Sequence, residues 1–364
     1  MLQKKILFLT PYPKGTAPSQ RFRFEHFYGV LTEAGFEIQT QSFIDIETWN
    51  ILYKPGNFFK KIFGFIKGII RRVWMLFRLH RYKIVFIHRE ALPFGPPIFE
   101  WLIKKVFRKK IVFDFDDAIW LPNVSDSNKK LGWLKNYKKT NRIIFYANLV
   151  FAGNSYLFQH SKKFNPNVLV MPTVIDTNYH KPAHSKILTE KIIIGWTGTF
   201  STLRHYEAIV PALIILKEKY ADKIGFQLIA DKKFYHDKLD IEFVKWNEQE
   251  EIKQLQKFDI GIMPLPDDEW AKGKCGFKGL QYMSLEIPPV MSPVGVNTEI
   301  IQDGVNGFLA ASEHEWIEKL SMLIENPELR TKLGKAARQT VIEKYSVESQ
   351  QQKYLEVFQS LCSK

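Results

Sequence analysis

At 364 residues, the chain is longer than one ordinary hydrophobic core requires and fits two domains of middling size. Its hydrophobic fraction of 45% and charged fraction of 25% are those of a folded globular protein and exclude a disordered chain. The excess positive charge behind the net charge of +14 lies in the first half, where residues 1–182 hold 29 Lys and Arg against 12 Asp and Glu. This asymmetry indicates an anionic partner such as a membrane surface or nucleic acid.

The cysteine content and the apolar runs bear on the compartment. Cys275 and Cys362 give neither a disulfide framework nor a metal-ligand cluster, so a reducing compartment is expected. The first apolar run, at residues 4–10, leads directly into a turn, as a first strand does and a secretory leader does not. Because no apolar run is long enough to span a bilayer, we predict a cytoplasmic protein.

Short runs rich in β-branched residues alternate with longer amphipathic stretches, beginning with KKILFLT at residues 4–10. This alternation is typical of parallel sheets that are covered by helices on both faces. We therefore predict an α/β fold with two doubly wound, Rossmann-like domains in tandem. The other strands are expected at residues 36–44, 83–88, 110–115, 148–153, 167–172, 192–198, 224–230, 258–264 and 288–295.

A polar stretch punctuated by prolines, at residues 172–191, interrupts this alternation and divides the chain. The predicted organisation is an N-terminal domain at 1–175, a linker at 176–191, a second domain at 192–345, and a C-terminal helix at 346–364 that crosses back to the first domain.

The segment GWTGTFSTLRHY, residues 195–206, has the form of an anion-binding loop. A strand ends at Gly195, and a helix begins near Thr202. Gly198 allows the backbone to approach a ligand closely, and the helix start with Arg204 in its first turn favours an anion. An ordinary strand-to-helix connection with an exposed arginine accounts for the same pattern, so both interpretations stay open.

The segment GKCGFKGLQYM, residues 273–283, is the second phosphate candidate. Lys274 and Lys278 place positive charge where a helix begins, and the helix dipole disfavours charge of that sign there. An anion bound between the two lysines removes this conflict, and Gly276 loosens the backbone beside it. The alternative is that Lys278 points to solvent, at a cost of about a few tenths of a kcal/mol.

Three carboxylates lie at the end of the strand at 110–115, in DFDDAIW. They have the chemistry to hold a divalent cation, but equally they can cap the helix that follows. The acidic run at 267–269 is more typical of a solvated turn.

Residues 54–83 hold nine Lys and Arg and no Asp or Glu. At helical spacing the apolar side chains share one face and the basic ones the opposite face, which is typical of a helix in the interface of an anionic membrane. A core-packing helix with a solvated basic face is the alternative. Nucleic acid fits less well, because no nucleic-acid motif appears. The side chains assigned to the membrane surface are Lys60, Lys61, Lys67, Arg71, Arg72 and Arg78.

The sequence resembles family 4 of the retaining glycosyltransferases, and residues 258–309 carry the most specific part of the similarity. In the second half the matching pieces are GWTGTFSTLRHY, FDIGIMPLPDDEWAKGKCGFKGLQYMSLEIPPVMSPVG and TEIIQDGVNGFLA. In the first half, PSQRFRF, IHREALPFGPP, FDFDDAIWLP and AGNSYL are similar to a bacterial branch of the family that serves envelope polysaccharides.

The resemblance implies an α/β fold of the GT-B type, with a cleft between the two doubly wound domains. It also implies that the nucleotide-sugar-binding domain is the second one, at 192–345, and that the acceptor-side domain is the first one, at 1–175. By position, Arg204 and Lys278 clamp the diphosphate and stabilise the leaving nucleotide without a metal or another cofactor. Retention in this family is thought to follow a front-face route, so no protein nucleophile is assigned. The other predicted donor residues are Gly198, Thr199, Lys274, Gly276, Phe277, Gln281 and Glu299.

Three positions depart from the family pattern. Gln281 and Gly273 stand where an acidic pair is usual, and Thr199 stands where an arginine often follows the first glycine of the donor loop. Gln281 can still accept a hydrogen bond from a ribose hydroxyl, but it carries no charge.

The acceptor residues are expected after the first strand, in PSQRFRF. Arg21 has the geometry to bind an acceptor phosphate bidentately, or it is a surface arginine in a loop. Asp114 is the predicted general base for the acceptor hydroxyl; in the alternative, the aspartates orient loop backbone. The predicted acceptor-binding residues are Ser19, Arg21, Arg23 and Asp116.

The resemblance, together with these patterns, implies a retaining, hexosyltransferase-type glycosyltransferase. Its donor is a nucleotide-diphosphate sugar, and its acceptor is a lipid-linked saccharide or polysaccharide at the inner face of the cytoplasmic membrane. One alternative is a catalytically silent nucleotide-sugar-binding protein, motivated by Gln281 and Gly273. Another is a metal-dependent phosphatase that uses Asp114 and Asp116. An oxidoreductase is disfavoured, because no G-x-G-x-x-G follows either first strand.

Overall fold

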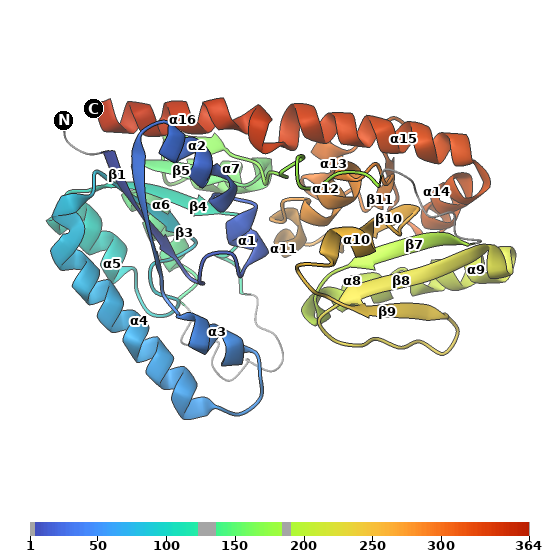
Figure 1. The fold of residues 1–364 in the computed structure, drawn as a ribbon, viewed down its shortest axis with the longest axis horizontal. Coiled ribbons are helices and arrows are strands. Elements are labelled where there is room, and N and C mark those ends of the chain that lie inside the picture. Colours follow the sequence, from blue (N-terminus) through green and yellow to red (C-terminus); the bar gives the residue numbers. More distant parts are fainter. Residues whose placement is uncertain (1–3, 123–135, 184–190, 364) are drawn as a thin grey trace. The chain divides into compact units, whose positions relative to one another are not determined.

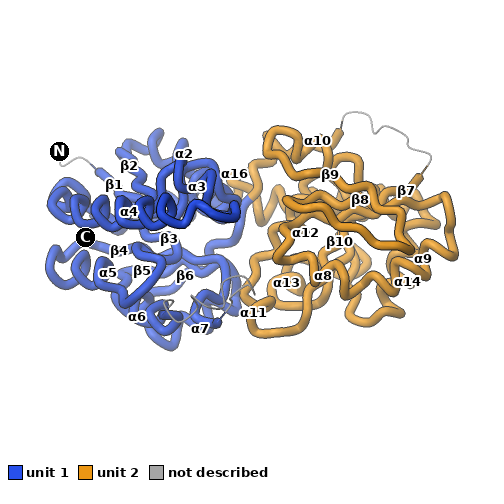
Figure 2. Tube along the Cα trace, turned by 90° about the horizontal axis from the view of Figure 1, so that it is seen from below, with its two compact units in different colours: residues 1–174, 350–364 blue, residues 175–349 orange. Residues whose placement is uncertain are grey.

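The computed structural model describes residues 4–122, 136–183 and 191–363, and the chain forms two compact units (Figure 2). Unit 1 consists of Met1–Val174 and Gln350–Lys364, and unit 2 consists of Ile175–Ser349. The predicted first domain ended at residue 175. Of the predicted linker at 176–191, residues 176–183 belong to unit 2, and 184–190 lie outside the described residues.

Unit 1 is built on a sheet of six parallel strands in the order β2-β1-β3-β4-β5-β6. The central strands are buried along most of their length, which explains why their sequences are continuously apolar. The strands are β1 (Lys4–Thr10), β2 (Phe36–Ser42), β3 (Ile84–His88), β4 (Lys110–Phe115), β5 (Leu149–Ala152) and β6 (Val168–Val170). The α-helices of its first segment are α1 (Pro18–Arg21), α2 (Tyr28–Glu33), α3 (Ile46–Leu52), α4 (Phe58–Arg78), α5 (Ile98–Trp101), α6 (Lys139–Tyr146) and α7 (Ser155–Lys162).

The end of the chain completes the core of unit 1. In α16 (Val347–Ser363), the ring of Tyr354 stacks on Phe27 with 4.1 Å between the ring centres. One turn further on, the ring of Phe358 lies 6.4 Å from that of Phe86 in β3. Both α16 side chains are fully buried. The aromatic core of unit 1 therefore draws on both of its chain segments.

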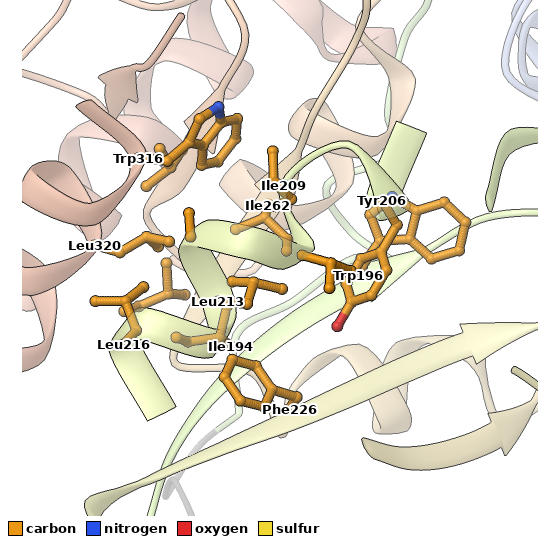
Figure 3. Packing of buried hydrophobic residues seen from close by; sticks show 14 of the residues in the cluster. Ile194, Trp196, Tyr206, Ile209, Leu213, Leu216, Phe226, Ile262, Trp316 and Leu320 are labelled. Carbon is orange, nitrogen blue, oxygen red and sulfur yellow. The ribbon is translucent and has the colours of Figure 1, made fainter. Parts of the chain in front are cut away.

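Unit 2 has a second sheet of six parallel strands, in the order β12-β11-β10-β7-β8-β9. Trp196 of β7, Leu213 of α9 and Trp316 of α14 belong to one buried cluster around this sheet (Figure 3). The strands are β7 (Ile192–Thr197), β8 (Ile224–Ala230), β9 (Ile241–Lys245), β10 (Ile260–Met263), β11 (Pro289–Met291) and β12 (Phe308–Leu309). The α-helices are α8 (Leu203–Glu207), α9 (Val210–Tyr220), α10 (Glu251–Leu255), α11 (Glu269–Lys272), α12 (Phe277–Ser284), α13 (Asn297–Ile300), α14 (Glu313–Glu325) and α15 (Pro327–Thr340).

The predicted basic amphipathic helix is α4, the long helix of unit 1 (Figure 1). Its glycines form the packed side. A Cβ atom at Gly64 would lie 2.1 Å from the Thr48 hydroxyl oxygen in α3, and one at Gly68 would lie 2.5 Å from the Phe43 carbonyl oxygen. The helix therefore approaches the rest of unit 1 at backbone distance along this side. No helix in the described ranges has the length and apolar character to cross a membrane.

Arg72 belongs to this packed side of α4, which corrects its assignment to the membrane surface. Its side chain is fully buried, and burial lowers the pKa of Arg72 to about 9. The guanidinium donates hydrogen bonds of 2.8–2.9 Å to three carbonyl oxygens that lie at or beyond the carboxyl ends of strands, those of Thr10, Gln41 and Ala91. Arg72 therefore anchors α4 to the sheet.

Candidate functional site

The first part of the candidate site is the loop after β7. A Cβ atom at Gly198 would lie 2.3 Å from the Trp196 ring and 2.8 Å from Nζ of Lys278. The loop backbone thus lies directly against these two side chains, and only glycine fits. Thr199 and Thr202 then form a capping box, each accepting a hydrogen bond from the backbone N–H of the other, and start the helical turns that lead to α8.

The second part is the N-terminus of α12. Its N-cap residue, Gly276, has a left-handed φ of 68°, and a Cβ there would lie 2.3 Å from Cδ1 of Ile300. Gly279 lets the helix lie directly on the sheet, because a Cβ would meet a methionine sulfur of β11 at 2.5 Å. The hydroxyl of Tyr282 accepts a hydrogen bond of 3.0 Å from the N–H of Thr197. This bond fixes α12 to the end of β7.

Four basic side chains gather where the loop and α12 meet: Lys278, Lys274, Arg204 and His205, here called the basic cluster. The ammonium of Lys278 lies 4.2 Å from the centre of the Trp196 ring, and Nε of Arg204 donates to Nε2 of His205 at 3.4 Å. Burial, and then the charge of Lys274, lower the pKa of Lys278 to about 7. Burial and the three other basic groups lower the pKa of His205 to about 4. A bound anion would relieve this crowding of positive charge.

Buried polar atoms without a hydrogen bond to any described residue accompany the basic cluster. Both amide atoms of Gln281, one turn beyond Lys278 in α12, are of this kind, and the side chain is fully buried. So are Nε1 of Trp196 and Nδ1 of His205. Protein interiors leave few polar atoms unpaired, so this group fits a ligand that brings phosphate and hydroxyl oxygens.

The structure therefore brings together several of the predicted donor residues. Their binding roles remain a prediction. Phe277 opens α12 half-buried, and Glu299 is exposed in α13. Sequence reasoning missed Trp196 and His205, for which the only signals were a tryptophan at a strand end and a histidine beside a candidate arginine. The predicted residues that lie in the loop, in the basic cluster or on α12 are Gly198, Thr199, Arg204, Lys274, Gly276, Lys278 and Gln281.

In unit 1, the structure corrects the roles predicted for Arg23 and Asp114. Both side chains are 1% exposed, and Nη2 of Arg23 donates to Oδ1 of Asp114 at 2.5 Å. Nδ1 of His88 lies 2.7 Å from the other carboxylate oxygen, and Arg23 also donates to the carbonyl of Met171. Burial raises the pKa of Asp114, but Arg23 and His88 outweigh it and hold the pKa below its ordinary value. The pair is a buried structural ion pair, so Arg23 is not placed to bind an acceptor or Asp114 to activate one.

Asp116 and Asp117 are held by Arg89, which follows β3 with a left-handed φ of 61°. Nε and Nη2 of Arg89 donate to Oδ1 of Asp116 at 2.9 and 2.8 Å, and Nη2 donates to Asp117 at 2.7 Å. Within residues 4–122, 136–183 and 191–363, no group of three or more His, Cys, Asp or Glu side chains is placed to hold a metal ion. The structure therefore gives the phosphatase alternative no support, because Asp114 and Asp116, the carboxylates that it uses, are each paired with an arginine.

Aromatic side chains lie beside Arg89. The Trp49 ring of α3 lies 4.9 Å from the ring of Tyr12, which follows β1, and 5.7 Å from that of Tyr53. Arg89 interacts electrostatically with both tyrosines. We call Tyr12, Trp49 and Tyr53 the aromatic surface of unit 1. Of the other predicted acceptor residues, Ser19 and Arg21 are half-buried in α1.

Comparison with known proteins finds a family model that matches part of unit 2. Residues 226–340 match the model of the family Glycosyl transferases group 1, and the match lies entirely within unit 2. No curated protein matches the chain.

Solved structures share the whole fold. A glycosyltransferase from Rickettsia africae superposes with a TM-score of 0.71 at 16% identity, with 98% of each chain covered. Sucrose-phosphate synthase from Thermosynechococcus elongatus gives 0.70 at 10% identity over 99% of each chain. HepE from Anabaena, solved with UDP and glucose, gives 0.67 at 14% identity over 98% of this chain and 100% of that one. The predicted resemblance and the GT-B fold are confirmed, and the family match supports the prediction of a glycosyltransferase.

Proposed function

We propose that this protein transfers a sugar, with retention of the anomeric configuration, from a nucleotide-diphosphate donor to a lipid-linked saccharide in the synthesis of a cell-envelope polysaccharide. The observation that carries the donor half of the proposal is the basic cluster beside the unpartnered amide of Gln281. A diphosphate would pair the cationic groups, and the hydroxyls of a ribose would pair the amide. HepE, which shares the fold, has been solved with UDP and with UDP-glucose.

In this mechanism, the side chains of unit 2 stabilise the leaving nucleotide. Negative charge grows on the diphosphate as its bond to the sugar breaks, and the fixed charges of Lys278 and Arg204 favour that state over the bound substrate. The backbone N–H groups at the start of α12 add a favourable dipole. These groups take the charge-balancing role that a divalent cation has elsewhere, so the proposed reaction needs no metal. We assign no protein nucleophile, in keeping with a front-face route.

For the acceptor half, we propose the aromatic surface of unit 1. The rings of Tyr12, Trp49 and Tyr53 offer flat apolar faces for the C–H groups of sugar rings. The half-buried ion-pair group of Arg89, Asp116 and Asp117 adds hydrogen-bonding groups for sugar hydroxyls. This surface replaces Arg23 and Asp114 as the proposed contact with the acceptor.

The donor assignment is tested by thermal unfolding with a panel of nucleoside diphosphates and nucleotide sugars, in the presence of a chelator. A ligand at about a hundred times its dissociation constant stabilises the fold by roughly 2.7 kcal/mol. We expect a selective shift that Lys278→Ala abolishes and that Lys257→Ala, an exposed lysine of the same unit, preserves. No shift with any member of the panel, or equal shifts in both variants, would refute the assignment.

The absence of the usual acidic pair supports one competing function. Gln281 and Gly273 are uncharged, as expected of a protein that binds a nucleotide sugar without turning it over. Turnover of any nucleotide sugar by the purified chain decides between the two, because a binding protein would show the thermal shift and no turnover.

A further inference from the structure

The face of α4 that carries most of its apolar side chains is turned to solvent. Phe59, Trp74 and Phe77 are 84%, 63% and 70% exposed. Ile62, Phe63 and Ile70 are exposed beside them. This finding contradicts the alternative in which α4 buries its apolar face in the core. Contiguous apolar surface of this kind marks a docking site on an otherwise soluble unit.

The packed side of α4, opposite to the exposed face, holds the helix against the rest of unit 1. Gly64 and Gly68 bring the backbone of α4 against Thr48 and Phe43, and Arg72 is buried beneath the helix with its carbonyl partners. Because this packed side consists of two glycines, an arginine and a methionine, the unit gains little apolar burial from it. Phe65, whose ring lies 5.7 Å from that of Phe43, packs against unit 1, but most of the large apolar side chains of α4 are exposed.

Basic side chains flank the exposed face. Lys67 follows Ile66 by one residue, which places it about 100° further round the helix, and Lys60 and Arg78 fall on the same flank. Arg71 also lies there, but its Nη2 donates to Asp45 at 3.0 Å. No Asp or Glu occurs in residues 54–83. The flank that these side chains form beside the apolar face is therefore cationic.

We propose that α4 docks unit 1 onto an anionic membrane surface, with its aromatic face at the boundary of the acyl chains and its basic flank among the headgroups. Charge complementarity selects this occupant, because a second copy of α4 would bring two cationic flanks together. The helix would lie in the interface, since its packed side stays bound to unit 1.

This docking deepens the proposed function, on which it rests for its biological purpose. Trp49, of the aromatic surface, belongs to α3, which packs against α4 where Thr48 meets Gly64. A docked α4 would therefore hold the aromatic surface near the headgroups. A saccharide carried on a membrane lipid is the class of acceptor that such a surface would meet.

The charge component is tested by co-sedimentation of the full chain with vesicles, in the absence of nucleotide. Vesicles of phosphatidylcholine with about 40% phosphatidylglycerol are compared with phosphatidylcholine alone. Replacing Lys60, Lys67 and Arg78 with Gln is expected to lower partitioning onto the anionic vesicles about 100-fold. The matched control, which removes the same charge from exposed sites of unit 1 outside α4, should bind within about threefold of the wild type; it carries Lys105→Gln, Arg142→Gln and Lys163→Gln.

The apolar component is tested through Trp74. Lipids brominated in their acyl chains should quench wild-type fluorescence, whereas Trp74→Phe should bind equally well and lose most of the quenching. A variant with Phe59→Ser and Phe77→Ser should lose vesicle binding while keeping its circular dichroism spectrum and its thermal shift with nucleotide sugars.

Three results would overturn the docking proposal. The first is unchanged vesicle binding in the Phe59→Ser, Phe77→Ser variant. The second is a loss of vesicle binding in the charge-matched control that equals the loss in the Lys60, Lys67 and Arg78 variant. The third is a wild-type dimer that dissociates in the serine variant, when neither protein binds vesicles. Because vesicle binding is measured without nucleotide and the thermal shift without vesicles, failure of the docking and failure of the donor assignment are distinguishable.

Discussion

Lys278 should make the binding of nucleotide sugars depend on pH near neutrality. In the free protein, burial and the charge of Lys274 lower the pKa of Lys278 to about 7, so its ammonium loses a proton as the pH rises through neutrality. A diphosphate beside the ammonium favours the charged form and raises this pKa. Binding therefore takes up protons and weakens as the pH increases.

The size of this effect follows from the pKa. For a group with a pKa of about 7, the protonated fraction falls from roughly 90% at pH 6 to roughly 10% at pH 8. If the donor binds only the protonated form, its dissociation constant rises about tenfold over this range, or about 1.4 kcal/mol. His205 does not contribute, because its pKa of about 4 keeps it neutral throughout.

Isothermal titration calorimetry measures the dissociation constant at each pH directly. The ligand is UDP-glucose, or whichever nucleotide sugar gives the largest thermal shift. Both phosphoryl groups of such a donor are esterified, so the ligand itself does not titrate between pH 6 and 8. Lys278→Arg retains a positive charge at every pH and should flatten the dependence, although the binding is weaker. A wild-type dissociation constant that stays constant from pH 6 to 8, or the same tenfold change in Lys278→Arg, would refute the reasoning.

Three further substitutions have expected outcomes. Gly198→Ala should abolish the thermal shift with nucleotide sugars, because its Cβ would lie 2.3 Å from the Trp196 ring; a normal shift would contradict the loop geometry. Gln281→Leu removes a buried amide without a partner, so urea unfolding should show a ligand-free protein more stable by about 1 kcal/mol, and calorimetry a weaker donor affinity. Asp114→Asn leaves the Arg23 guanidinium buried without a countercharge, so stability in urea should fall by roughly 3–5 kcal/mol; a neutral result would mean that the ion pair is not structural.

The strands of the fold could be predicted from the sequence because a buried parallel strand is apolar on both faces. KIVFDF predicted a strand at residues 110–115, and β4 spans Lys110–Phe115. The candidate site at the N-terminus of α12 could be predicted for a different reason. Gly276 and the two lysines around it conflict with an ordinary helix start, and the structure adds to this conflict by placing the half-buried Lys278 over the Trp196 ring.

The wrong assignments share one physical cause. A sequence shows that an arginine is present, but not which groups its guanidinium contacts in the fold. Arg23 is paired with Asp114, 91 residues away, and Arg72 is bound by backbone carbonyls that have no sequence signal at all. His205 was missed for a similar reason, because its importance comes from lysines of another helix and loop that the fold brings to it.

The central claim is that the protein transfers a sugar from a nucleotide donor with retention. It is tested most directly by a donor hydrolysis assay, in which water takes the place of the acceptor. Proton NMR spectra of the purified chain with an α-linked nucleotide sugar and a chelator reveal which anomer of the free sugar appears before mutarotation. We predict that the α-anomer appears first and that Lys278→Ala prevents its release. The β-anomer appearing first, or no release from any nucleotide sugar that stabilises the fold, would contradict the claim.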